Sequence, residues 1–174
     1  MSFEIPLKLL HLFQCLILII SFCSYYLLVQ FSSFDAKKIL DIHMSLGTFS
    51  LLCSLFINTC LMFYFIGTST WIKDQYSMIM LKNSDFKKEL KQIYQAANKL
   101  KGRTFPGITI SLALAIFSFI YGGEKLLTNS QGSTIHIVLV SLLIILNILM
   151  TPVYFKAINK NYWFLNDVSE MLES

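Results

Sequence analysis

Four long apolar stretches dominate the pattern of this sequence. They cover about residues 9–31, 42–70, 106–123 and 134–155, and short or strongly charged segments separate them. A helix rises about 1.5 Å per residue, so about 20 apolar residues are enough to cross the hydrocarbon core of a bilayer. The pattern therefore predicts an all-α protein: a four-helix transmembrane bundle in which residues 1–174 form a single integral membrane domain.

Prolines and glycines mark the expected ends of two spans. Pro106 suits a first helical turn, where its missing N–H would be unpaired anyway, so we expect the third span to open there. Gly122 and Gly123 are expected to end the same span. Pro152 lies near the end of the fourth span and should kink it or loosen its last turn.

The charged loop at residues 72–105 carries a helical pattern of its own. Its apolar positions recur at helical spacing, and most of its lysines lie elsewhere on the helical wheel; these apolar positions are Phe86, Leu90, Ile93, Ala97 and Leu100. We predict an amphipathic helix on the inner membrane surface, capped by Asn83, Ser84 or Asp85. The preferred interpretation of this helix is a connector between spans, and the alternative is a docking face for a partner or anionic lipid. Residues 156–174 are expected to form an inner C-terminal tail.

Composition and charge place the chain in a membrane and suggest its direction. Hydrophobic residues make up 55% of the chain and charged residues only 14%, against about 25% in ordinary globular proteins. Eight Lys and Arg residues lie within 73–103, whereas only three lie in the two connections on the opposite side: Lys37, Lys38 and Lys125. The positive-inside rule therefore predicts a multi-pass protein of the cell inner (plasma) membrane with both termini cytoplasmic. The basic residues flank the spans, so we exclude nucleic acid as a partner and expect the lipid bilayer instead.

Two of the three histidines are expected to meet near the outer face. His43 begins the second span and His136 begins the fourth, so the predicted topology places them at similar depth. Two imidazoles from facing helices are the axial ligands that a b-type haem requires, and Gly47, one turn after His43, would leave room for the macrocycle. The sequence thus nominates His43, His136 and Gly47 as a haem site, with iron on the two histidines. The alternative is that these interfacial histidines only bond water and head groups.

Other polar residues within the spans indicate packing. Asn58 and Asn147 lie towards the middle of the second and fourth spans, and an amide facing lipid is costly, so both should face inward. They could bond each other or a neighbouring hydroxyl, or else line a ligand cavity. The four cysteines all lie in apolar stretches, which indicates small hydrophobic packing residues. No Asp, Glu, Lys or Arg occupies the middle of a span, which weighs against an ion-coupled transporter or proton pump.

Two segments resemble small four-span bacterial membrane proteins. They are Tyr64–Asp74, with the sequence YFIGTSTWIKD, and Lys101–Pro106, with the sequence KGRTFP. This resemblance supports the four-span topology and implies no activity.

Three functions are compatible with these features. The first is a non-enzymatic accessory or scaffold subunit that assembles with membrane-protein partners or with itself. The alternative is a small haem-binding electron-transfer protein, and the third, ranked last, is a pore-forming oligomer. The distance between His43 and His136 distinguishes the first two. A haem needs both imidazoles within ligand reach, whereas a scaffold needs no shared cavity between them.

Overall fold

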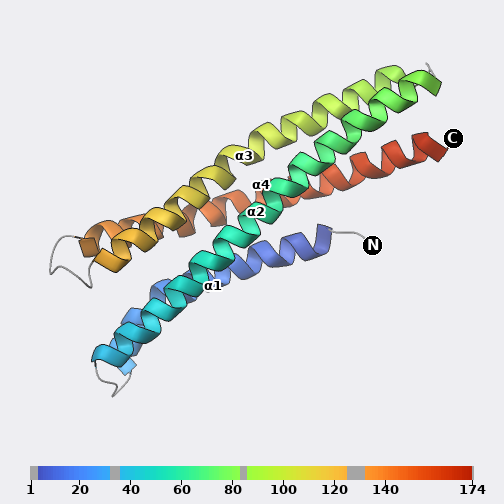
Figure 1. Ribbon diagram of the computed structural model, residues 1–174. Coiled ribbons are helices and arrows are strands. Elements are labelled where there is room, and N and C mark those ends of the chain that lie inside the picture. Colours follow the sequence, from blue (N-terminus) through green and yellow to red (C-terminus); the bar gives the residue numbers. More distant parts are fainter. Residues whose placement is uncertain (1–3, 32–35, 83–85, 125–131, 174) are drawn as a thin grey trace.

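The chain forms four helices in the computed structural model. They are α1 (Glu4–Phe31), α2 (Ala36–Lys82), α3 (Lys87–Glu124) and α4 (Gly132–Glu173) (Figure 1). The structure describes residues 4–31, 36–82, 86–124 and 132–173, and it describes side chains within 4–24, 37–78, 86–122 and 134–173. The segment 83–85 and Lys125 lie outside the described residues. Within these ranges there are no strands, so the all-α prediction is confirmed.

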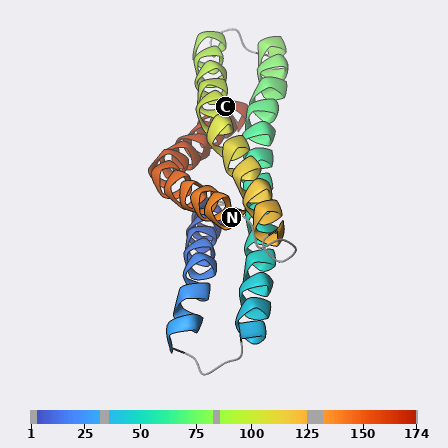
Figure 2. The same cartoon turned by 90° about the vertical axis from the view of Figure 1, so that its left-hand side faces the viewer.

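Successive helices run in opposite directions, so the molecule has two distinct ends. The start of α1, the end of α2, the start of α3 and the end of α4 lie at one end, and the other four helix ends lie at the opposite end (Figure 1). We call these the termini end and the histidine end, because His43 and His136 lie near the start of α2 and α4. α4 continues through Pro152 to Glu173, and Figure 2 shows that it changes direction part-way along its length.

The bundle buries many polar side chains and exposes many large apolar ones. Fourteen of the described buried side chains are polar, and Asn58, Ser54 and His11 are fully buried. Large apolar side chains face outward instead, with Phe63 64% and Leu149 65% exposed. Soluble proteins show the reverse distribution, whereas a lipid solvent favours this one. Each of the four helices also contains a stretch long and apolar enough to cross a membrane, which indicates a multi-pass membrane protein.

The third helix corrects the sequence interpretation. Pro106 was expected to open a separate span, but α3 is one helix from Lys87 to Glu124 with Pro106 inside it. The first half of α3 is the amphipathic helix expected on the membrane surface. Its apolar positions Leu90, Ile93 and Ala97 are buried in a cluster with Ile72 of α2 and Val168 of α4 instead. A proline inside a helix costs about 3 kcal/mol. The free energy gained by burying these apolar side chains against neighbouring helices is larger, so the helix continues through Pro106.

This cluster shows that α2, α3 and α4 all extend beyond their expected spans. The described residues of the predicted loop (72–82 and 86–105) and of the predicted tail (156–173) therefore continue the long helices, and they pack together at the termini end. Partly buried aromatic and sulfur-containing side chains complete this extension, and they are Trp71, Tyr76, Phe86, Tyr94, Phe164 and Met171.

Candidate functional site

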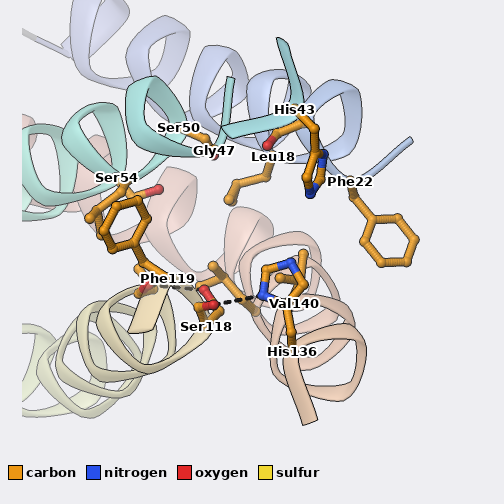
Figure 3. Close-up of a pocket in the computed structure, with 14 residues that line it drawn as sticks. Leu18, Phe22, His43, Gly47, Ser50, Ser54, Ser118, Phe119, His136 and Val140 are labelled. Atoms are coloured by element: carbon orange, nitrogen blue, oxygen red, sulfur yellow. Dashed lines mark hydrogen bonds between the residues drawn. The ribbon is translucent and has the colours of Figure 1, made fainter. Parts of the chain in front are cut away.

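His43 of α2 and His136 of α4 lie next to each other at the histidine end of the bundle. Their ring centres are 6.3 Å apart and their ring planes are almost perpendicular, at 88°. Figure 3 shows the two imidazole rings turned toward each other, with a nitrogen of each ring on the facing side. The fold therefore brings together two histidines that are 93 positions apart in the chain.

The hydrogen bond of His136 decides which of its nitrogens carries the proton. His136 Nδ1 lies 2.6 Å from the backbone carbonyl oxygen of Ser118 in α3 (Figure 3). A carbonyl oxygen can only accept, so Nδ1 must donate and therefore carries the proton. In the neutral ring Nε2 is then the nitrogen with a lone pair. An Nδ1–H bond to a backbone carbonyl is the usual anchor of a histidine that ligates a metal through Nε2.

His43 reaches the same state through a serine. Its Nδ1 lies 2.9 Å from the Ser24 hydroxyl of α1, and that hydroxyl lies 2.7 Å from the Ser21 carbonyl oxygen. The hydroxyl has one proton and must donate it to the carbonyl, so it accepts from His43 Nδ1–H. The lone pair of His43 is therefore also on Nε2. Both rings present the same nitrogen as the potential ligand.

A small cavity adjoins the two rings. It has a volume of about 50 Å³. All four helices line it, and Gly47 is among the lining residues. An added Cβ on Gly47 would meet no atom within 4 Å, so the space beside it is open. Small side chains form much of the remaining wall, and they are Ser21, Ser50, Ser54, Ala115 and Ser118.

Comparison with protein families, with curated proteins and with solved structures finds no match for this chain. The chemistry of the site therefore has to be inferred from its own residues. Among the described residues, no group of three or more His, Cys, Asp or Glu side chains is placed to hold a metal ion. A bare metal ion between His43 and His136 would thus have two protein ligands.

Gly122 of α3 keeps the place of the His136 ring open. A Cβ at this position would lie 2.8 Å from both Cε1 and Nδ1 of His136, closer than carbon and nitrogen atoms can approach without a shift. We expect Gly122→Ala to push the ring off the Ser118 carbonyl. Overpacking of this kind costs about 1–3 kcal/mol, and the gain in helix propensity of about 1 kcal/mol offsets only part of it.

The apparent melting temperature in mild detergent measures this effect, with Gly67→Ala as the matched control. A Cβ on Gly67 would meet no atom within 4 Å, so that variant should be as stable as the wild type or slightly more stable. A Gly122→Ala protein that melts no lower than the Gly67→Ala protein would contradict the close approach.

A second polar cluster lies in the middle of the bundle, around Ser111 of α3. Asn147 Nδ2 donates to the Ser111 hydroxyl over 3.0 Å, and Asn58 Nδ2 reaches the same oxygen over 3.5 Å. Gln14 of α1 donates to Asn147 Oδ1 over 3.3 Å. Both asparagines are therefore buried and bonded through a shared hydroxyl. We call Gln14, Asn58, Ser111 and Asn147 the central polar cluster.

The third histidine continues this polar interior toward the termini end. His11 is fully buried, and its Nε2 lies 3.0 Å from the Thr151 hydroxyl. Its ring centre is 5.0 Å from that of Tyr154, in an edge-to-face arrangement. Six buried polar atoms of the described residues have no hydrogen-bond partner: His11 Nδ1, Gln14 Oε1, Ser54 Oγ, Asn58 Oδ1, Tyr154 Oη and Asn161 Oδ1. Most of them belong to or adjoin this polar interior, where buried water commonly completes such bonds.

Sequence reasoning found the histidine pair but missed the groups that orient it. The sequence did not single out Ser24 or Ser118 as site residues, yet the Ser24 hydroxyl and the Ser118 carbonyl set the tautomers of the two rings. Gln14 and Thr151 were not nominated at all. A glutamine inside an apolar helix is the signal that points to the central polar cluster, because an amide facing lipid is costly.

Proposed function

We propose that this protein holds one b-type haem between His43 and His136 and carries single electrons in the membrane. The strongest support is the position of the proton and of the lone pair on each of the two imidazole rings. Each Nδ1–H is anchored by an oxygen, and each lone pair is on Nε2. Two neutral imidazoles prepared in this way are the axial ligands of a six-coordinate haem iron.

The spacing of the rings agrees with this chemistry. A metal–nitrogen bond of about 2 Å on each side, added to the distance from each nitrogen to its own ring centre, gives about 6 Å between centres. The ring centres of His43 and His136 are 6.3 Å apart. A hydrogen bond through one bridging proton would bring the two nitrogens to about 3 Å, so the rings would then lie closer together.

The number of ligands that the protein offers at this site also fits a haem. The macrocycle supplies four nitrogens of its own and needs two from the protein, whereas a structural zinc ion takes four from the protein. The described residues offer two histidines here and no third ligand. With both axial positions filled by protein, the iron would have no open site for oxygen, which favours electron transfer over oxygen chemistry.

The walls of the cavity indicate where the macrocycle would enter. The cavity volume of about 50 Å³ is far too small for a porphyrin, so the macrocycle would have to extend into the open space beside Gly47. Leu18, Phe22 and Phe119 also line this space, and their side chains would have to turn aside. Apolar and aromatic walls with a few polar groups are the usual surroundings of a buried cofactor.

An electron carrier with a single haem needs a donor and an acceptor. The accessory-subunit hypothesis therefore complements the haem proposal: the chain would work beside other membrane proteins or a second copy of itself. The pore hypothesis has less support, because the amides and the hydroxyl of the central polar cluster bond to one another within the bundle.

Haem reconstitution tests the proposal. The purified protein in detergent is titrated with haemin, and absorbance is recorded in the oxidised and dithionite-reduced states. We expect saturation at one haem per chain, with the sharp Soret and α bands of a low-spin, six-coordinate iron. A titration that gives only the broad spectrum of free haemin in the same detergent would reject the proposal.

A further inference from the structure

A groove between α3 and α4, about midway along both helices, combines positive charge with an apolar wall. It has a volume of about 540 Å³. Arg103 of α3 and Lys156 and Lys160 of α4 line it together with the apolar side chains of Leu100, Met150 and Val153. No carboxylate is among its lining residues. None of its lining residues also lines the cavity beside His43 and His136, so nothing in its interpretation rests on the haem proposal.

The three cations have no internal counter-charge. All three side chains are exposed, and none forms an ion pair or hydrogen bond with a residue that the structure describes. Three positive charges gathered around one groove repel one another, so their arrangement favours an anionic occupant. Arginine adds a planar fork of donors that matches the oxygens of a phosphate group.

The groove lies where the apolar stretches stop. Arg103 precedes the apolar stretch of α3 by three residues, and Lys156 directly follows that of α4. The stretch at 134–155 is about 33 Å long at about 1.5 Å per residue, close to the thickness of the hydrocarbon core. The three cations therefore lie at the level of the lipid head groups. The positive-inside prediction assigns this level to the cytoplasmic leaflet, whose surface is anionic.

We propose that this groove is a binding site for an anionic phospholipid. Arg103, Lys156 and Lys160 hold the phosphate of the head group, and one acyl chain lies along Met150 and Val153. These two residues precede Lys156 on α4 and so lie on its membrane side. Basic pockets between spanning helices on the cytoplasmic side bind anionic head groups in this way. The apolar wall distinguishes a lipid from a soluble phosphate, which would have no use for it.

Native mass spectrometry of the protein released from mixed nanodiscs tests the site. The nanodiscs contain equal amounts of phosphatidylglycerol and phosphatidylcholine, and the retained lipid is counted. We expect wild type to retain phosphatidylglycerol about thirtyfold over phosphatidylcholine, since each basic contact is worth about 1 kcal/mol and two of the three contacts already give about that ratio. The triple variant Arg103→Gln, Lys156→Gln, Lys160→Gln should lose most of this preference.

The matched control removes the same charge elsewhere. Lys87, Lys88 and Lys91 are exposed on the first turns of α3 and do not line the groove. The variant Lys87→Gln, Lys88→Gln, Lys91→Gln should keep the wild-type preference, and circular dichroism checks that both variants remain helical. An equal loss in both variants would show an effect of net charge alone and would overturn the site. Adding inorganic phosphate should leave the retained lipid unchanged, and displacement by it would show that a soluble anion is the occupant instead.

Discussion

Replacing either His43 or His136 with leucine is expected to lower the affinity for haem by more than about tenfold. Removing a residue that only hydrogen-bonds a metal ligand already lowers metal affinity about 10–100-fold. Removing the ligand itself takes away one of the two bonds between the iron and the protein. Any haem that remains should have one protein ligand and show the spectrum of a five-coordinate, high-spin iron. Absorbance and electron paramagnetic resonance of the reconstituted variants measure both effects.

Two further variants make this experiment specific. Ser24→Ala removes the hydroxyl that accepts from His43 Nδ1–H, so affinity should fall by about 10–100-fold while the iron stays six-coordinate. His11→Gln changes the histidine that is bonded to Thr151 in the polar interior and does not line the cavity, so its spectrum should match that of the wild type. The site would be misassigned if the His11 variant lost the low-spin spectrum and the other two histidine variants kept it.

Asn147→Leu is expected to destabilise the bundle by about 3 kcal/mol. Its amide accepts from Gln14 of α1 and donates to Ser111 of α3, so it links three helices. An interhelical hydrogen bond in a membrane protein contributes about 0.6 kcal/mol, and up to about 1.7 kcal/mol. A larger cost comes from leaving the fully buried Gln14 without a partner, about 1–3 kcal/mol. The free energy of unfolding in a detergent titration measures the change.

Asn159→Leu provides the matched control for this variant. It makes the same chemical change on α4, at an exposed position, and should alter the free energy of unfolding by less than about 0.5 kcal/mol. The double variant Gln14→Leu, Asn147→Leu should recover part of the loss, because removing both partners leaves no unsatisfied amide. If Asn147→Leu were as stable as Asn159→Leu, the central polar cluster would not contribute to holding the helices together.

The membrane character of this chain is decided by local chemistry and could be predicted without a structure. A stretch such as 134–155 is long and apolar enough to cross a bilayer, and it would do so as a helix because unpaired backbone groups are costly in lipid. The same reasoning predicts that Asn58 and Asn147 face inward. The pairing of His43 with His136 also follows from counting spans, since antiparallel helices bring the starts of α2 and α4 to one end.

Contacts between distant segments could not be predicted in this way. The amphipathic pattern at residues 86–100 shows that one face is to be buried, but a lipid surface and a neighbouring helix satisfy the same pattern. Only the fold shows that Leu90 packs against Ile72 and Val168, which is why α3 continues through Pro106. The proton positions on the histidines likewise depend on Ser24 and Ser118, which come from other helices.

The amino-acid sequence by itself thus determined four helices long and apolar enough to span a membrane, a predicted orientation and a pair of histidines at one end. These features follow from the free energy of transferring each segment between water and lipid, which does not depend on the other segments. The tertiary structure decided how the pair is used, by placing the rings 6.3 Å apart with Nδ1 of each anchored. It also gathered Arg103, Lys156 and Lys160 around one groove. Both outcomes depend on which helix faces meet, a property of the packed bundle that no single segment carries.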